Sequence, residues 1–584
     1  MRTTRTLACL VASLTISTFA VLPQTASAQN LTKADTSVRK AMQNGATSLR
    51  VIVRTDAACG PTLKNSLKSH GDVVVSEQPS IGGWTAVIHA THVREFEADP
   101  CVSRVSDDAI VATHAGPKGG GGATAAVNML RETLGLPATA TGAGVTVAVI
   151  DSGLLSGEDF NGRFAGFYNF LNGDSRFTLS EDAYGHGTHV GGLIGSSGAK
   201  SSGQYAGVAP GVRLIAMMAL DRNGQGRTSD VINAIAYATA NKDRLGIDII
   251  NLSLGHPIYE PAAADPLVQA VEQAVRAGIV VVASAGNFGV NEQTGESGYG
   301  GISSPGNAPS AITIGAFKMN GTAGRGDDVP APFSSRGPTW YDGYGKPDLL
   351  APGHRLVSNT SRTTNLYKNY SALRVSSDFL TLSGSSMATA VASGVAALIL
   401  EANPSLAPNA VKAILQFSAF RMKDSLGVEY DTLTQGAGAI NAAGAISLAA
   451  AINTAVPVGS YWLTSGLGPV TTIAGVAIPW AQNIVWGDNI VWGDSVSFNR
   501  EAWALNIVWG DDIVWGDNIV WGDNIVWGDN IVWGDNIVWG DNIVWGDNIV
   551  WGDTTNPANI VWGDIYSIAT TTSNSDVWAT LTFP

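Results

Sequence analysis

The chain has 584 residues, of which 45% are hydrophobic and 14% charged, and its formal net charge at pH 7 is −14. This length is too great for one ordinary domain, so several folded units are expected. Residues 481–584 carry nearly all of the charge, with 14 acidic residues against the single Arg500. Such acidity argues against nucleic acid as a partner, because phosphates are repelled, but it belongs to the tail and says little about the rest of the chain.

The first 28 residues have the organisation of a secretory signal peptide. Arg2 and Arg5 precede an apolar stretch over 7–22, and Ala26-Ser27-Ala28 is typical of a cleavage site. The alternative, a membrane anchor, is disfavoured because the apolar stretch is short and contains Ser and Thr. We therefore expect secretion, to the extracellular space or the cell surface, and no membrane span elsewhere in the chain.

Residues 29–115 are predicted to form a small α+β unit. Strand-like stretches at 49–53, 73–75 and 84–88 alternate with helical ones at 63–69 and 93–98, in the β-α-β-β-α-β order of a ferredoxin-like fold. Cys9 leaves with the signal, and the remaining Cys59 and Cys101 both fall in this unit, where they could pair in an oxidising compartment. The Gly-rich segment 116–124 is predicted to be a flexible linker.

Residues 125–452 alternate between strand and helix patterns. Near-continuous apolar stretches at 145–150, 212–220, 247–254 and 279–283 are typical of strands buried on both faces. Helical segments are expected at 229–244, 267–277, 387–401 and 410–420. This alternation predicts an α/β domain built on a parallel sheet with helices on both faces.

Residues 453–480 are expected to connect this domain to a repetitive, β-rich tail at 481–584. Ile-Val-Trp-Gly-Asp occurs eleven times between 484 and 564, and eight copies run at a strict period of six over 507–553. Hairpins with Gly-Asp turns are one interpretation, and a solenoid of stacked hexads, which is weakly favoured, is another. A third is low complexity without a fixed fold. The tail could contact the cell surface or glycans, although no known motif supports this.

Three short motifs, far apart in the chain, supply a carboxylate, an imidazole and a hydroxyl. They are Val-Ile-Asp-Ser-Gly at 149–153, Gly-His-Gly-Thr-His-Val at 185–190 and Gly-Ser-Ser-Met-Ala-Thr at 384–389. Asp151 ends a predicted strand, His186 lies between two glycines, and Ser386 precedes a predicted helix. Each alone has an ordinary structural explanation, as a turn, a core histidine or a helix cap. Together they predict nucleophilic catalysis.

The three side chains suit the steps of acyl transfer. An alcohol such as Ser386 is a weak nucleophile until a base removes its proton, and the imidazole of His186 titrates near neutral pH. Asp151 would fix the imidazole tautomer and stabilise its charged form. The free N–H groups of the helix after Ser386 would favour developing negative charge. His189 is interpreted as structural, because no third ligand accompanies the two histidines.

These motifs and their order resemble the subtilisin-like serine proteases, or subtilases. The order Asp, His, Ser separates this family from serine hydrolases on other folds. The resemblance covers roughly residues 140–450 and includes Lys346-Pro347-Asp348, Ala351-Pro352-Gly353 and Gly436-Ala437-Gly438. The chain departs from the family at Ser385, where Thr is usual, and at Ala390, where Pro is usual. Neither change removes a catalytic group.

The resemblance implies further site residues. Asn287, in Ser-Ala-Gly-Asn after a predicted strand, would donate to the oxyanion alongside the Ser386 N–H, although an isolated Gly-Asn is also common in turns. Two segments match the family's strands that pair with an extended peptide, and their structural alternatives are a buried strand end and a glycine turn. The substrate-binding residues so implied are Ser253, Leu254, Gly255, Gly224 and Gly226.

The resemblance also implies how the protein is made and what it does. The unit at 29–115 resembles the family's inhibitor-type propeptide, with an unrelated accessory domain as the alternative. We therefore expect a secreted serine endopeptidase, made as a self-processing proenzyme, that hydrolyses protein or peptide substrates through an acyl-enzyme on Ser386. The chemistry requires no cofactor. Structural calcium is common in the family, but no loop here matches a calcium site, so metal ligands stay unassigned.

Two other functions remain open at this point. One is a non-catalytic surface or scaffold protein whose active part is the hexad tail, although all three triad residues are present. The other is a serine esterase with the same triad, although the predicted peptide-pairing strands favour peptide substrates.

Overall fold

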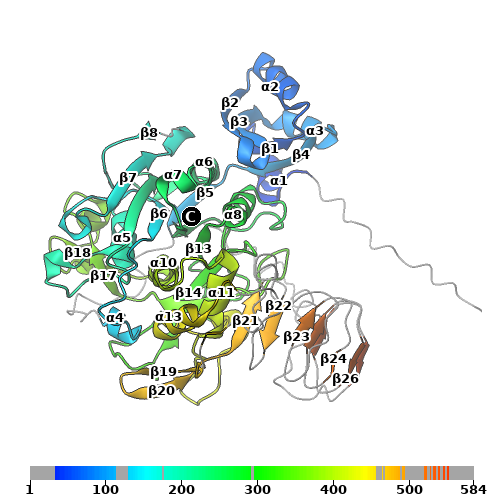
Figure 1. The fold of residues 1–584 in the computed structure, drawn as a ribbon. Helices are drawn as coiled ribbons and strands as arrows, with labels where there is room; N and C mark the ends of the chain where they lie inside the picture. The colour runs from blue at the N-terminus through cyan, green and yellow to red at the C-terminus, as the bar shows by residue number, and fades with distance from the viewer. Residues whose placement is uncertain are drawn as a thin grey trace, which may run out of the picture.

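The structure is a computed structural model that describes residues 33–113, 129–173, 176–290, 295–455, 463–464, 467–486 and 489–492, together with short strands between 519 and 551 (Figure 1). An α+β unit at the N-terminus lies against a larger α/β domain. The predicted signal peptide and the linker at 116–124 lie outside the described residues.

The N-terminal unit is a four-stranded antiparallel sheet with helices packed against it. The strands lie in the order β2-β3-β1-β4, and every neighbouring pair is antiparallel. The expected elements are present as β1 (Ser48–Thr55), α2 (Gly60–Ser69), β2 (Val73–Gln78), β3 (Gly83–His89) and α3 (Ala90–Ala98). Strand β4 (Val102–Asp107) is the closing strand of the expected order, for which no bounds were predicted, and helix α1 (Thr36–Gln43) was not expected. Asp35 caps α1, because its side chain accepts a hydrogen bond from the Val38 N–H.

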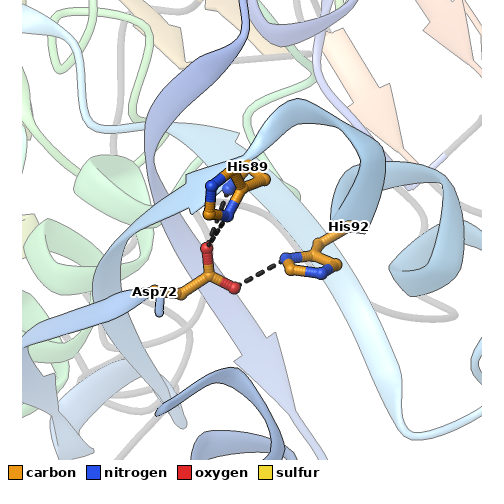
Figure 2. Close-up of side chains that lie close together, drawn as sticks. All are labelled: Asp72, His89 and His92. Atoms are coloured by element: carbon orange, nitrogen blue, oxygen red, sulfur yellow. Dashed lines mark hydrogen bonds and ion pairs between the residues drawn. The ribbon is translucent and has the colours of Figure 1, made fainter. Parts of the chain in front are cut away.

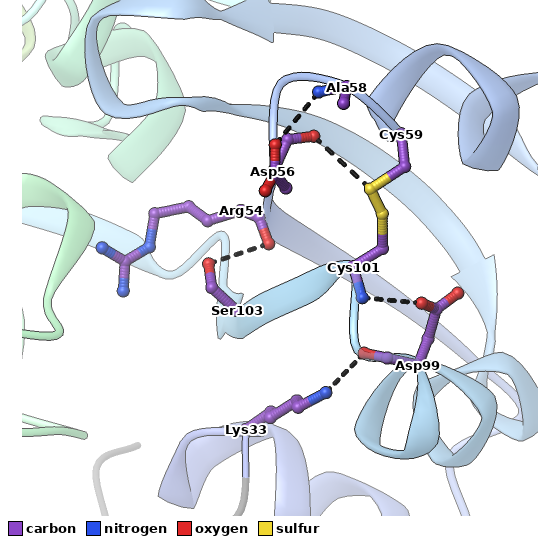
Figure 3. Close-up of a disulfide and its surroundings, with 8 residues drawn as sticks. All are labelled: Lys33, Arg54, Asp56, Ala58, Cys59, Asp99, Cys101 and Ser103. Atoms are coloured by element: carbon purple, nitrogen blue, oxygen red, sulfur yellow. Dashed lines mark hydrogen bonds between the residues drawn. A yellow bond between two sulfur atoms is a disulfide. The ribbon is translucent and has the colours of Figure 1, made fainter.

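A disulfide closes this unit. Cys59 lies just before α2 and Cys101 just before β4, and the two are bonded with their Cα atoms 6.2 Å apart (Figure 3). Each cysteine is held by a nearby aspartate. The Cys59 N–H donates to the Asp56 carbonyl at 3.2 Å, and the Cys101 N–H donates to the Asp99 carboxylate at 2.8 Å. The bond spans 42 residues, so it removes much of the conformational freedom of the unfolded unit.

The α/β domain is built on a nine-stranded sheet. Its order is β15-β14-β13-β11-β6-β9-β7-β8, with β16 paired to β14. The strands are β6 (Thr146–Asp151), β7 (Phe164–Asn169), β8 (Arg176–Phe177), β9 (Arg213–Met218), β11 (Ile249–Leu252), β13 (Val280–Ser284), β14 (Ile312–Lys318), β15 (Val329–Pro330) and β16 (Leu349–Pro352).

The sheet is mixed, which corrects the expectation of a parallel sheet. The central pairs are parallel, but β8 pairs with β7 and β15 with β14 in the antiparallel direction. Each of these two edge strands directly follows its neighbour in the chain, and such short connections reverse the chain direction. The two edge strands are each only two residues long, too short to give the apolar pattern that marked the central ones.

Both faces of the sheet are covered by helices. In β6, Val147 and Val149 face one core, while Ala148 and Ile150 face the other, and all four are buried. The first core contains α10 (Ser385–Ala402), α11 (Pro408–Phe417) and α13 (Ala442–Ala451), and the second contains α6 (Thr228–Ala240) and α8 (Pro266–Arg276). Burial on both faces explains the continuous apolar strands that the sequence shows.

One helix of the described part of the chain is long and apolar enough to cross a membrane. This helix is α10, and 83% of its 18-residue window is buried inside the fold. Its apolar surface is therefore accounted for by packing against the sheet.

The second half of the expected connector packs onto the domain. Strands β19 (Val470–Ile473) and β20 (Val476–Pro479) form an antiparallel hairpin. Ile473 and Trp480 are buried in the first core, and the Trp480 Nε1–H donates to Thr471 Oγ1 at 2.7 Å. This hairpin thus belongs structurally with the α/β domain.

Short strands recur in the repeat tail. Within the described segments, β21 (Asn483–Trp486) pairs antiparallel with β22 (Asn489–Trp492). Further along, β23 (Ile519–Trp521), β25 (Ile531–Trp533) and β27 (Ile543–Trp545) pair in parallel and in register. A second parallel row consists of β24 (Val526–Trp527), β26 (Ile537–Trp539) and β28 (Ile549–Trp551). Alternate repeats therefore lie next to each other.

Candidate active site

The first two predicted triad residues are brought together at the end of the central strand. Asp151 is the last residue of β6, and His186 is the first residue of α5 (His186–Gly195). His186 Nδ1 lies 2.7 Å from Asp151 Oδ1 and 2.9 Å from Oδ2, and both side chains are fully buried. A hydrogen bond from Nδ1–H to the carboxylate leaves Nε2 with its lone pair, which is the tautomer that a general base needs.

The start of α5 is fixed by a buried aspartate, Asp182, whose role was not predicted from the sequence. Asp182 accepts hydrogen bonds from the Gly185 N–H at 2.7 Å and from the Thr188 N–H at 2.8 Å. It also accepts the Ser152 hydroxyl at 2.9 Å, and burial raises its pKa. The signal was available, since an acidic residue just before a helix start is typical of a cap. Asp182 thus positions His186 by holding the first turn of its helix.

Gly187 is required by a close approach of two backbone segments. A Cβ at this position would lie 1.9 Å from the Gly153 carbonyl oxygen, well inside van der Waals contact. Only glycine lets α5 pack this closely on the segment that follows Asp151. The two glycines around His186 in the sequence motif therefore have a steric reason.

Ser386 lies in the first turn of the buried helix α10, beside Ser253. The Ser386 hydroxyl donates to the Ser253 carbonyl at 3.0 Å, and the Ser253 hydroxyl donates to the Ser386 carbonyl at 2.9 Å. The Asn251 amide donates to the Ser253 hydroxyl at 3.0 Å. His186 Nε2 is buried and makes no hydrogen bond within the described residues, so the structure forms the Asp–His pair but does not join it to the serine hydroxyl.

Asn287 lies next to the start of the same helix. Its side-chain Oδ1 accepts a hydrogen bond from the Ser385 N–H at 2.9 Å. Ser385 in turn accepts the Gly286 N–H at 3.2 Å through its hydroxyl. Ser385 stands where the family usually has threonine, and its retained hydroxyl links the Asn287 loop to α10.

His189 is held inside the fold, away from solvent. Its Nε2 lies 3.1 Å from the Leu380 carbonyl oxygen and 3.2 Å from that of Leu356. Burial and the neighbouring His186 lower its pKa to about 3. A histidine that stays neutral and hydrogen-bonds backbone carbonyls has the structural role that the sequence predicted.

A strand from the N-terminal unit occupies the space between the two predicted substrate strands. Strand β5 (Ile110–Thr113) lies between β10 (Gln225–Arg227) and β12 (Leu254–Gly255), and both pairings are antiparallel. Ala112 is opposite Gln225 on one side and Gly255 on the other. The Thr113 N–H also donates to the Gly224 carbonyl at 3.2 Å. The chain thus carries an extended segment of its own in the position expected for a peptide.

The N-terminal unit is anchored to the α/β domain by polar contacts as well. Asp108 caps α6, because its carboxylate accepts the Ser229 N–H at 2.8 Å and the Ser229 hydroxyl at 2.9 Å. Arg104 forms a buried ion pair with Glu260 at 2.8 Å. Burial, and then the nearby Asp265, raise the pKa of Glu260 to about 7.

Comparison with known proteins places these features in one class. The sequence model of the subtilase family matches residues 142–441. Serine protease AprX of Bacillus subtilis is 45% identical over 310 residues, which cover 52% of this chain and 66% of AprX. Subtilisin DY of Bacillus licheniformis is 34% identical over 284 residues, which cover 49% of this chain and 86% of that protein.

A solved structure has the same fold. Fervidolysin of Fervidobacterium pennivorans, a keratinolytic enzyme related to subtilisin, matches with a TM-score of 0.52 and 21% identity, covering 69% of this chain and 61% of that protein. The fold and the sequence matches thus define an α/β serine protease. The chain belongs to the subtilase family.

Proposed function

We propose that this chain is a secreted serine endopeptidase, made as a self-processing proenzyme. The observation that carries the proposal is the position of β5 between β10 and β12. Pairing on both edges binds an extended peptide through main-chain hydrogen bonds, which give affinity with little selectivity for its side chains. Such a site suits the polypeptide substrates of an endopeptidase better than the small substrates of an esterase.

The catalytic roles follow from the contacts of the three motifs. His186 Nε2 would take the proton of Ser386 as the hydroxyl oxygen attacks a peptide carbonyl, and would then give it to the leaving amine. Asp151 would stabilise the imidazolium between these steps. The Ser386 hydroxyl must first leave the Ser253 carbonyl and turn towards His186. Water then hydrolyses the acyl-enzyme, and no cofactor enters any step.

The oxyanion would be stabilised by donors at the start of α10. The Asn287 amide is oriented through its Oδ1 by the Ser385 N–H, and the Ser386 N–H belongs to the first turn of the helix. Preorganised donors of this kind act without reorganisation when charge develops. We therefore assign Asn287 the oxyanion role, and Ser253, Leu254, Gly255, Gly224 and Gly226 the substrate-pairing role.

We assign residues 29–115 as the propeptide and 125–452 as the catalytic domain. The antiparallel order β2-β3-β1-β4 supports a ferredoxin-like propeptide. Its last strand blocks the peptide-binding edges, so the propeptide would act as an intramolecular inhibitor until it is cleaved and released. The register of β5 favours cleavage at the first bonds after Thr113, because Leu254 faces Thr113 and the next residue back, Ser253, contacts Ser386.

Secretion and the tail complete the proposal. The pattern at 1–28 predicts a signal peptide, and the Cys59–Cys101 bond suits an oxidising compartment. In the tail, parallel in-register pairing of alternate repeats supports a stacked, β-rich arrangement over a row of hairpins. Contact of the tail with the cell surface or glycans stays a prediction. The alternative of a non-catalytic scaffold protein is not favoured for a member of a protease family.

Replacement of the nucleophile tests the proposal. A Ser386→Ala chain should lose casein hydrolysis and labelling by a fluorophosphonate, and should keep its N-terminal unit attached. Ser447→Ala, which removes an exposed hydroxyl on α13, is the matched control and should behave as the parent. N-terminal sequencing of the secreted parent should begin shortly after Thr113. Casein hydrolysis by Ser386→Ala at the parent's rate would refute the assignment.

A further inference from the structure

Three metal-ligating side chains meet in the N-terminal unit, on three different elements. Asp72 directly precedes β2, His89 is the last residue of β3, and His92 lies in the first turn of α3. Figure 2 shows both histidine rings turned towards the Asp72 carboxylate. His89 Nδ1 lies 2.7 Å from Asp72 Oδ1, and His92 Nδ1 lies 2.6 Å from Asp72 Oδ2. One ligand atom from each residue lies within 4.8 Å of the other two.

The contact between Asp72 and His92 is close but is not a hydrogen bond. Asp72 is 6% exposed and His92 is 9% exposed, so both are shielded from water. Despite their 2.6 Å separation, Asp72 Oδ2 and His92 Nδ1 both lack a hydrogen-bond partner of acceptable geometry. The two atoms form a buried ion pair that lacks a well-directed hydrogen bond, and such a buried pair is costly and calls for an explanation. A bound cation supplies one, because an ion attracts both lone pairs without needing an N–H directed at the oxygen.

The backbone already holds the carboxylate in place for such a role. The His89 N–H donates to Asp72 Oδ1 at 2.9 Å. Metal ligands are usually oriented by outer hydrogen bonds of this kind. The His89 side chain is exposed, which leaves the cluster open to ions from solvent on one side. The site is therefore both preorganised and accessible.

The donor set selects the class of ion. Two imidazole nitrogens and one carboxylate oxygen suit zinc and neighbouring divalent transition metals, whereas calcium and magnesium prefer oxygen donors. In a tetrahedral zinc site, ligands about 2.0–2.2 Å from the metal lie roughly 3.3 Å from one another. One ligand atom from each of the three residues already lies within 4.8 Å of the other two, so the donors would close in by up to about 1.5 Å around an ion. A tetrahedral ion needs a fourth ligand. His70, whose ring centre is 5.3 Å from that of His92, or a water molecule could supply it.

We propose that Asp72, His89 and His92 form a zinc-type metal site on the N-terminal unit. The ion would join the start of β2, the end of β3 and the first turn of α3. Because the unfolded chain does not hold these three groups together, a bound ion would stabilise the folded unit. The site is separate from the Asp–His–Ser chemistry and does not depend on it.

Zinc binding to the whole proenzyme tests the proposal. The Ser386→Ala chain, without a histidine tag, is treated with a chelator, dialysed and titrated with zinc chloride in a calorimeter. We expect one zinc ion per chain, and a rise in the unfolding temperature of the N-terminal unit when zinc is present. Cobalt in place of zinc should give visible absorption bands typical of tetrahedral coordination by nitrogen and oxygen.

Matched variants connect the binding to the cluster. His92→Asn and His89→Asn should each weaken zinc binding by more than about a hundredfold, beyond the usual effect of residues that only orient a ligand. His354→Asn, in the α/β domain, should bind zinc as the parent does. Because His89 is exposed, its variant should keep the fold even if His92→Asn does not. A parent that binds no zinc, or an unaltered affinity in the folded His89→Asn chain, overturns the proposal.

Discussion

Ser253 and Ser386 exchange hydrogen bonds, since each hydroxyl donates to the other residue's carbonyl oxygen, at 2.9 and 3.0 Å. The segment between β11 and β12, which we propose pairs with the peptide, is thereby tied to α10, which carries the proposed nucleophile Ser386. Under the proposed roles, this pair of hydrogen bonds would couple the position of the substrate to that of the nucleophile.

Removal of the Ser253 hydroxyl should lower turnover without weakening peptide binding. Ser253→Ala loses two buried hydrogen bonds, to the Ser386 carbonyl and from the Asn251 amide, each worth about 1 kcal/mol, and leaves the main-chain atoms of residue 253 untouched. We expect kcat to fall by no more than about tenfold, with KM nearly unchanged. Steady-state kinetics on a peptide substrate provide the measurement. A rise in KM with constant kcat would show that the hydroxyl serves binding instead.

Loss of the charge on Asp182 should disturb the position of His186. In Asp182→Asn, one acceptor oxygen becomes an NH2 group that faces backbone donors, which should cost about 2–3 kcal/mol of stability. We expect kcat to drop by at least about tenfold because the base is misplaced. The neighbouring exposed variant Glu181→Gln should change neither quantity. Denaturant unfolding and kinetics of both variants decide the point, and an active, stable Asp182→Asn protein would contradict it.

Asn287→Ala should reduce turnover far more than it reduces stability. Removal of one oxyanion donor lowers kcat on the order of a hundredfold in subtilisin-type proteases, and this magnitude is taken from the family. KM should change little, because the charge that the amide stabilises exists only in the transition state. The same variant should still be labelled slowly by a fluorophosphonate. An increase in KM alone would assign Asn287 to substrate binding.

Rising pH should favour release of the propeptide. Around Glu260 lie Arg104, which pairs with it, and the acidic Asp265 and Asp35, and burial is the largest cause of its raised pKa. If undocking returns the pKa from about 7 to the ordinary 4.5, a proton is released between these pH values. Docking is then strongest below this window and weakens, by up to about tenfold per pH unit, as pH rises through it.

The charge-neutral variant Glu260→Gln isolates this effect. It keeps the size of the side chain and a hydrogen-bond acceptor for Arg104, but it has no proton to release. The fraction of cleaved propeptide that stays bound, measured by gel filtration at about pH 5 and about pH 8, should fall with pH in the parent and much less in the variant. Equal pH dependence in the two proteins would mean that another group controls release.

Loss of the disulfide should destabilise the propeptide before the protease. A bond that closes 42 residues is expected to contribute about 4 kcal/mol by the chain-entropy model. Cys59→Ser with Cys101→Ser should therefore lower the yield of processed protease, while protease already matured should keep its activity under reducing conditions. Thermal unfolding of the Ser386→Ala proenzyme with and without reductant measures the same quantity. An unchanged transition would rule out a stabilising role.

Much of the fold and the pairing of Asp151 with His186 could be predicted from local sequence. Val147 to Ile150 form a continuous apolar run because both faces of β6 are covered, and Asp151 follows directly where the strand ends. Ser386 precedes a long apolar stretch that becomes α10. Burial on both faces, helix starts and glycine contacts all leave marks within a few neighbouring residues.

Contacts between distant segments left no such mark. The antiparallel edge strands, the insertion of β5 and the meeting of Asp72 with His89 and His92 were decided by tertiary structure. Each depends on where two or more elements lie relative to one another. Sequence spacing constrains the geometry within an element, whereas packing of whole elements sets the distances between them, because many weak contacts decide that packing together.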